Sequence, residues 1–166
     1  PDAVWCTDIG EHLSHALLTE AFMRRQVHKT SVALVMGVVE ADSGTLDKPI
    51  GESLDPESCL MTTHPDAVDP RAALTHFQVL ERFPEHTLVE AKPVTGRHHQ
   101  IRAQLASIGC TVKGDLKYGF PRSNPDGSIH LHSRSVEFEH PVKKGKISVV
   151  ARPPKDSVWD YFVAKG

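Results

Sequence analysis

The residues best suited to chemistry lie between Thr95 and Arg102, in the run TGRHHQIR. This run places two guanidinium groups, two imidazole rings and an amide at the predicted start of a short helix, where free backbone N–H groups also attract anions. His98 precedes Arg102 by four residues and His99 by three, so one helical face can present imidazole and guanidinium together. Arginine suits a buried carboxylate because its planar fork donates paired hydrogen bonds and keeps its charge. The spacing is equally compatible with a helix whose charges are solvated.

Metal, thiol and nucleotide chemistry receive little support. His130 and His132 share one face of a predicted strand, but no HExxH pattern, cysteine pair or carboxylate completes a metal site. Cys6, Cys59 and Cys110 are odd in number and widely spaced, which indicates structural thiols in an intracellular compartment, the cytoplasm or an organelle such as the mitochondrion. The chain contains no GxGxxG or Walker-type loop, so we expect no nucleotide cofactor.

Charge is distributed unevenly, although the whole sequence has a net charge of only −2 at pH 7. Between Val38 and Glu90, eleven acidic residues accompany three basic ones, whereas Lys92 to Tyr118 holds five basic residues and one acid. Pro141 to Lys155 adds five basic residues and no acid. The two basic stretches predict a surface for an anionic ligand if they fold together, although each charged run can also be a solvated face.

Hydrophobic patterning predicts the elements that position these residues. Glu11 to Val27 has apolar residues at helical spacing that we expect to pack in the core. Ser31 to Val39 indicates a strand buried on both faces, and the next stretch, to Pro70, an irregular excursion with short strands. We expect Thr75–Glu81 and Thr87–Val94 to form a pair of strands, and His98–Ile108 to form the helix that carries the site. A hairpin with its turn at Lys143–Gly145 and a last helix at Val158–Val163 follow.

The length of 166 residues and a hydrophobic content of 39% fit one domain spanning residues 1–166. We predict an α+β fold, with a mostly antiparallel mixed sheet flanked by helices and an acidic insertion at about residues 40–70. No apolar run reaches the roughly 20 residues of a membrane helix. The first residue is Pro1 rather than methionine, so we expect the native start to be missing.

Several short motifs together resemble those of the RluA-type RNA pseudouridine synthases. The most specific are TGRHHQIRAQLASIG, from Thr95 to Gly109, and GDLKYG, from Gly114 to Gly119. Six further stretches follow the family's order: F-x-x-R-x-V-x-K from Phe22 to Lys29, then ALVMG, LDKPIG, ALTHFQVLE, HLHS and FEHPVKKGK. The resemblance runs from about Glu11 to Pro154 and implies the C-terminal portion of a pseudouridine synthase catalytic domain.

This resemblance implies an isomerase that converts a uridine of structured RNA, ribosomal or transfer RNA, into pseudouridine without metal or organic cofactor. The family flips the uridine out of the stack, an aspartate attacks the sugar or assists elimination, and the freed uracil turns so that C5 rejoins C1′. By motif position, the catalytic arginine that keeps the aspartate ionised is Arg102. The implied RNA-phosphate ligands are Lys29, Arg97, Lys113 and Lys117, and the other implied substrate-binding residues are Ser31, His99, Gln100, Tyr118 and Leu131, the last packing beneath the flipped base.

Two positions depart from the family pattern. The family's aspartate lies in an H-R-L-D-x-x-T-S-G motif whose aligned position falls just before Pro1, and Asp2 and Asp8 are the only acids near it. Ser31 stands where the family has a tyrosine that stacks on the uracil and is implicated in proton removal from C5. Three interpretations therefore stay open: an active pseudouridine synthase lacking its N-terminal part, a catalytically inactive RNA-binding protein such as a ribosome assembly factor, and a protein-binding domain using the acidic face.

Overall fold

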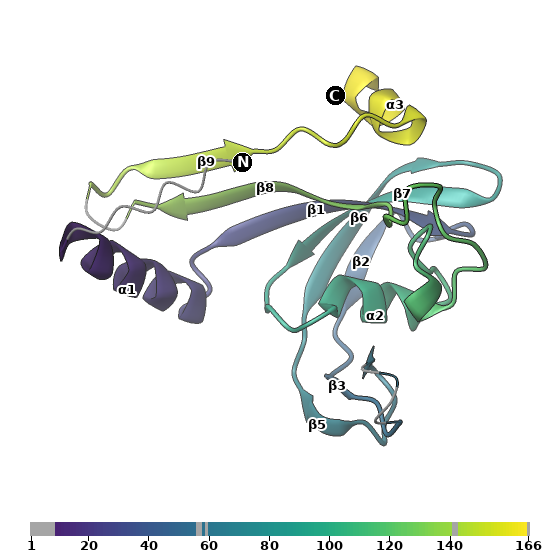
Figure 1. The fold of residues 1–166 in the computed structure, drawn as a ribbon, viewed down its shortest axis with the longest axis horizontal. Coiled ribbons are helices and arrows are strands. Elements are labelled where there is room, and N and C mark those ends of the chain that lie inside the picture. Colours follow the sequence, from purple (N-terminus) through teal and green to yellow (C-terminus); the bar gives the residue numbers. More distant parts are fainter. Residues whose placement is uncertain (1–8, 56–57, 59, 141–142, 166) are drawn as a thin grey trace.

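A six-stranded antiparallel sheet forms the centre of the fold in the computed structural model, which describes residues 9–55, 58, 60–140 and 143–165 (Figure 1). The strand order is β2 (Ser43–Leu46), β6 (Thr75–Arg82), β7 (His86–Pro93), β1 (His28–Met36), β8 (Leu131–Glu139) and β9 (Lys146–Val150). Helix α2 (Gln100–Ala106) and helix α3 (Ser157–Lys165) lie on opposite sides of this sheet (Figure 1). The α+β class and the antiparallel sheet flanked by helices are thereby confirmed.

Strand β1 is central because its apolar, β-branched run can be buried on both faces. Residues 31–35 are all buried, as the sequence predicts. Ala33 and Val35 pack on the α2 side with Leu105, whereas Val32 and Leu34 pack on the α3 side with Trp159. The alternation of strand side chains thus gives the sheet two separate cores.

Two histidines hold α3 on its side of the sheet. The His130 imidazole is buried, its Nε2 lies 3.2 Å from Asp156 Oδ1, and that same oxygen accepts the Val158 N–H at 2.8 Å, which caps the start of α3. The rings of His130 and His132 lie 5.6 and 5.8 Å from the Trp159 ring. Both imidazoles thus pack against α3. Within the part of the chain that the structure describes, no three His, Cys, Asp or Glu residues could hold a metal ion.

A small three-stranded sheet projects from the body below α2 in Figure 1. Its strands are ordered β4 (Met61–Thr62), β3 (Ile50–Glu52) and β5 (Val68–Arg71). A Cβ atom at Gly51 would lie 2.4 Å from the Val68 carbonyl oxygen, so only glycine fits this strand pair. At its root, Ile50 packs with Ala73 and Ala103, and Met61 and Tyr118 pack against them. The predicted irregular excursion therefore has an ordered base next to α2.

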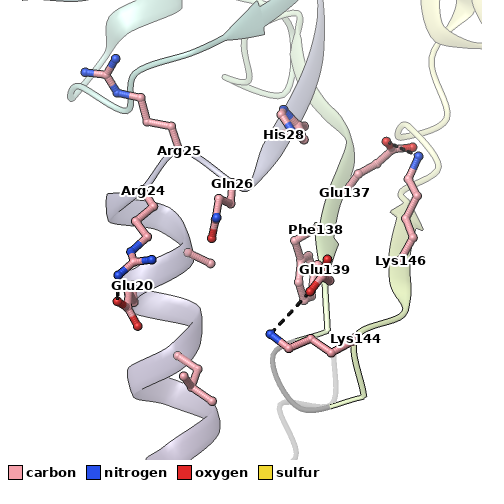
Figure 2. Close-up of a pocket in the computed structure, with 12 residues that line it drawn as sticks. Glu20, Arg24, Arg25, Gln26, His28, Glu137, Phe138, Glu139, Lys144 and Lys146 are labelled. Atoms are coloured by element: carbon pink, nitrogen blue, oxygen red, sulfur yellow. Dashed lines mark ion pairs between the residues drawn. The ribbon is translucent and has the colours of Figure 1, made fainter.

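Helix α1 (Ile9–Met23) stands beside the sheet rather than over it (Figure 1). A groove of about 830 Å³ separates α1 from the β8–β9 hairpin (Figure 2). Phe22 is 50% exposed and Met23 is 79% exposed. The expectation that the apolar stripe of this helix packs in the core is therefore wrong for Phe22, because no described element covers its end of the helix. None of the described helices is long and apolar enough to cross a membrane.

Candidate functional site

Two buried glutamines, one helical turn apart, join α2 by hydrogen bonds to residues 73–75 at the start of β6. Gln104 is 0% exposed, accepts the Thr75 hydroxyl at 2.7 Å, and donates to the carbonyl oxygens of Leu46 and Ala73 at 3.0 and 3.1 Å. The Gln100 amide donates to Leu74 O at 2.9 Å and to Thr75 Oγ1 at 2.8 Å. Gln100, predicted to bind substrate, is thus engaged within the protein and sets the position of α2.

The turn between β7 and α2 is ordered by the same amide. The oxygen of Gln100 accepts the Thr95 hydroxyl at 2.7 Å and the Arg97 backbone N–H at 3.0 Å. Arg97 Nε donates to the Ala72 carbonyl at 3.1 Å. His99 precedes the helix with a φ of 52°, a left-handed conformation that histidine tolerates better than most residues. These contacts order the turn, with Thr95 and Gln100 buried in the body of the fold.

Arg102 faces a carboxylate, but this is Asp115 and not the N-terminal aspartate that the family resemblance implies. Its Nε and Nη2 donate to Asp115 Oδ2 and Oδ1 at 2.7 and 2.8 Å. The Arg102 side chain is 17% exposed and the Asp115 side chain 1%. The Asp115 hydrogen bond is the main reason that the pKa of Arg102 is raised. A guanidinium has five N–H donors, and Asp115 takes two of those of Arg102 among the described residues. The other edge of the guanidinium can therefore bind a second anion.

Asp115 is placed by the tight GDLKYG loop. Gly114 has a φ of +85°, and a Cβ atom there would lie 2.7 Å from both Asn124 Nδ2 and the Ser128 carbonyl. The backbone of Asp115 donates to Val112 O at 3.0 Å, and its own carbonyl accepts the N–H of Tyr118 at 3.1 Å. Glycine is the residue that permits this backbone path, and the path buries the carboxylate beneath α2.

Tyr118 and His99 complete the site around the guanidinium. The Cζ atom of Arg102 lies 4.8 Å from the centre of the Tyr118 ring, a cation–π contact. The Tyr118 hydroxyl lies 3.0 Å from His99 Nδ1 and accepts a hydrogen bond from the Met61 backbone. Burial is the main reason that the pKa of Tyr118 is raised, and the protonated phenol shares a hydrogen bond with Nδ1. His98 stacks on His99 at 3.9 Å between ring centres. Asp115 and Tyr118 thus contact the Arg102 guanidinium, and the two histidines pack behind Tyr118.

His99 is a neutral imidazole in this site. Burial, followed by the charges of Arg102, His98 and Lys117, lowers its pKa from 6.5 to about 4, while Asp115 acts in the opposite direction. At pH 7 the ring is therefore uncharged, and its hydrogen bond with the Tyr118 hydroxyl joins two neutral groups.

We expect an NMR titration to place the pKa of His99 near 4 in the folded chain and near 6.5 in urea. Because the unfolded chain binds this proton more readily, His99 lowers the stability of the fold as pH falls from about 6.5 towards 4. Substitution His99→Gln, which cannot be protonated, should remove that part of the pH dependence. A His99 resonance that titrates near 6.5 in the folded chain contradicts this arrangement.

The structure separates two of the predicted phosphate ligands. Lys117 lies in the 3₁₀ helix η1 (Leu116–Tyr118) and acts electrostatically on His99. Lys113 acts instead on His86 and lines an apolar cavity of about 330 Å³ on the α3 side. Only Lys117 therefore lies on the Arg102 side of the sheet.

Three further predicted site residues come from β1 and β8. Leu131 packs against the core on the α2 side. Ser31 is 8% exposed, between Ala91 and Ser133 of the neighbouring strands. Lys29 lies near the turn before α2, because a Cβ atom at Gly96 would be 3.9 Å from its Nζ. The structure thus brings Lys29 near Arg97, whereas Ser31 and Leu131 belong to the body of the sheet.

The functional residue that sequence reasoning missed is Asp115. It is the only acid between Lys92 and Tyr118, and a lone acid among five cations is a signal for an ion pair. The family resemblance instead implies an aspartate partner near or before Pro1, and Asp2 and Asp8 lie outside the described residues.

A profile of the family described as RNA pseudouridylate synthase matches residues 12–107, which include β1, β6, β7 and all of α2. The chain belongs to the RNA pseudouridylate synthase family. Helix α2 with Arg102 therefore falls within the matched segment, whereas Asp115 and Tyr118 follow it.

Relatives in this family share most of the described fold. The chain is 37% identical over 145 residues to the uncharacterized RNA pseudouridine synthase YlyB of Bacillus subtilis, covering 87% of this chain and 46% of that protein. It is 34% identical over 152 residues to ribosomal large subunit pseudouridine synthase D of Xanthomonas campestris, covering 84% and 44%. The solved structure of human RNA pseudouridylate synthase domain containing 1 superposes with a TM-score of 0.74 at 25% identity, over 93% of this chain and 64% of that one. The chain spans about half the length of the curated relatives it matches.

Proposed function

We propose that this chain carries the arginine side of the active site of an RNA pseudouridine synthase, which isomerises uridine to pseudouridine in structured RNA. The observation that carries the proposal is the Arg102 guanidinium, held on one edge by buried Asp115 and on its face by Tyr118. A fixed guanidinium with donors to spare is suited to keep a second carboxylate ionised. Relatives named for the ribosomal large subunit support ribosomal RNA as the substrate to test before transfer RNA.

Asp115 is not the attacking carboxylate in this proposal. A nucleophile must reach the sugar of the flipped uridine, whereas Asp115 is 1% exposed with both oxygens bound to Arg102. Asp115 instead orients Arg102, and the free edge of the guanidinium meets the attacking aspartate. As the aspartate bonds to C1′, the bond from C1′ to N1 breaks and the uracil turns. C5 then bonds to C1′ as the aspartate leaves, and the C5 proton passes to water while N1 takes up a proton.

The decisive test uses RNA transcribed with uridine tritiated at C5, because forming the new bond releases that tritium to water. The chain is incubated with a labelled large-subunit ribosomal RNA fragment, and Arg102→Lys serves as the folded control. Tritium release that requires Arg102 supports the synthase. If neither release nor binding of the RNA is measured, the proposal is wrong.

A second candidate, an inactive RNA-binding member of the family, is favoured by Ser31. A buried serine on β1 offers neither a ring to stack on uracil nor a useful base for the C5 proton. This candidate is supported over the synthase if the chain binds RNA in a salt-dependent way but releases no tritium. The same result must hold when the tritiated RNA is the one that a related synthase modifies.

Charge reversal distinguishes the two faces of the sheet. We expect Lys117→Glu to weaken RNA binding and to reduce the slope of log K against log salt by about 1. Lys113→Glu should leave the slope unchanged, because Lys113 lies on the α3 side near His86. The matched pair alters net charge equally, and equal slopes for both variants would contradict RNA binding on the α2 side. Filter binding across a salt series measures both.

A further inference from the structure

A second hollow surface lies beside the candidate site, between the α1–β1 turn and the β7–α2 turn. Two adjoining cavities of about 480 and 410 Å³ share Arg25, Lys29 and the Pro93–Val94 wall. Their volumes fall within the range of about 300–1,000 Å³ that is usual for ligand sites. The smaller cavity continues to Gly96 and Arg97, the start of the run that leads to Arg102.

Three cations of this groove lack acidic partners. Arg25, Lys29 and Arg97 take part in none of the ion pairs found among the described residues. The neighbouring Arg24 differs, because its Nη2 lies 2.6 Å from Glu20 Oε1. Figure 2 shows Arg24 paired with Glu20, while the Arg25 guanidinium extends away from both. The positive charge of the groove is therefore available to a ligand.

Arg25 occupies a backbone position that favours glycine. Its N–H donates to Phe22 O at 3.1 Å and the next N–H, of Gln26, donates to Ala21 O at 2.9 Å, the hydrogen-bond pattern of a glycine-terminated helix. The φ of Arg25 is +57°, a conformation that costs energy for any residue with a Cβ atom. A positive φ that is kept at Arg25 in spite of this cost points to a role for the Arg25 side chain.

An aromatic ring lies at the entrance to the groove. Phe22 lines the smaller cavity, its ring is half-exposed, and Lys29 Nζ lies 4.9 Å from the ring centre. Exposed aromatic rings next to cations are the arrangement with which proteins hold single-stranded nucleic acid, since the ring stacks on bases and the cations bind phosphates.

We propose that this groove binds a single-stranded segment of RNA that flanks the target uridine. Arg25, Lys29 and Arg97 each contact a phosphate, and Phe22 stacks on one base. The inference rests on the proposed function for the identity of the ligand. It adds a track that leads the RNA strand from the end of α1 to the Arg102 site.

The test compares Arg25→Gln with Arg24→Gln, which change net charge equally at adjacent positions. The probe is a short single-stranded oligouridylate, whose binding is measured across a salt series. Each phosphate contact contributes about 0.7 to the slope for a single strand. We expect Arg25→Gln to reduce the slope by about 0.7, so that its affinity falls about 2.6-fold less than that of the original chain between 50 and 200 mM salt. Arg24→Gln should keep the original slope.

Two further variants separate binding from folding. Arg25→Gly should raise the melting temperature, because glycine relieves the left-handed backbone, and should weaken oligouridylate binding as Arg25→Gln does. Phe22→Leu should lower oligouridylate affinity about 5- to 150-fold without changing the binding of inorganic polyphosphate, which has no bases. Equal slopes for the Arg25 and Arg24 variants contradict RNA binding in this groove. An oligouridylate affinity that is independent of salt contradicts it as well. Tritium release from ribosomal RNA tests the proposed function separately, so either can fail alone.

Discussion

Substitution Arg102→Ala should lower the free energy of unfolding by about 3–5 kcal/mol, because it leaves a buried charge without its partner. Asp115 is 1% exposed, so water cannot replace the lost guanidinium without opening the site. A loss of this size is a large part of the 5–15 kcal/mol that stabilises an ordinary domain. Urea denaturation followed by circular dichroism measures it.

The double variant Arg102→Ala with Asp115→Ala identifies the cause of that loss. Since it leaves no buried charge behind, it should be more stable than Arg102→Ala alone by about 2 kcal/mol. If the double variant is instead less stable by the sum of both single losses, the two side chains act independently and the ion pair has no special role.

The same pair makes a prediction for catalysis that folding does not confound. Arg102→Lys keeps a positive charge but not the planar fork that Asp115 orients. We expect it to stay folded and to lose about 10²-fold in tritium release, the size of effect that misplacing a catalytic group produces. Arg102→Lys with unchanged release would refute the assigned role.

Gln104→Leu should lower the free energy of unfolding by about 3–5 kcal/mol, although it adds an apolar side chain to a buried position. The change removes the amide donor to the Leu46 and Ala73 carbonyls and the acceptor of the Thr75 hydroxyl, and each unpaired buried group costs about 1–3 kcal/mol. Thermal and urea unfolding measure the loss, with Gln26→Leu as the exposed control.

Gln104→Glu gives a sharper test of the same contacts. The shape is retained, but a carboxylate would face two carbonyl oxygens in a fully buried position, so its pKa should be raised. A raised pKa means that the folded chain binds the proton more readily, and the variant should therefore regain stability as pH falls below neutral. A variant as stable as the original chain at pH 7 would show that the amide donors contribute nothing.

Elements with a strong hydrophobic pattern were predictable from the sequence. Strand β1 and helix α2 formed where apolar spacing placed them, because burial and local periodicity point to the same structure. The apolar stripe of α1 predicted a helix, yet a stripe does not reveal what covers it, and Phe22 remains half-exposed. The ends of elements shifted by a few residues, since tertiary hydrogen bonds such as those of Gln100 decide where α2 begins.

The site was predicted in part. The type of partner that Arg102 requires follows from guanidinium chemistry, but its identity depends on how a loop thirteen residues later folds back beneath α2. Once Val112 is placed, the side of the sheet on which Lys113 lies follows from the alternation of side chains along an extended chain. Val112 bridges to Val35 and packs on the α2 side, so the next side chain along must point to the other face.

The link between Met61 and the Tyr118 hydroxyl divides the acidic excursion into an outer tip and a root that contacts the site. Its outer tip, where Leu54 is 67% exposed, can change in sequence and length without disturbing the Arg102 site. Its root at Ile50 and Met61 packs against the Tyr118 ring, which lies against Arg102. A change at the root would therefore alter the position of the Arg102 guanidinium. Diversity among related sequences should therefore concentrate at the tip and fade towards β4.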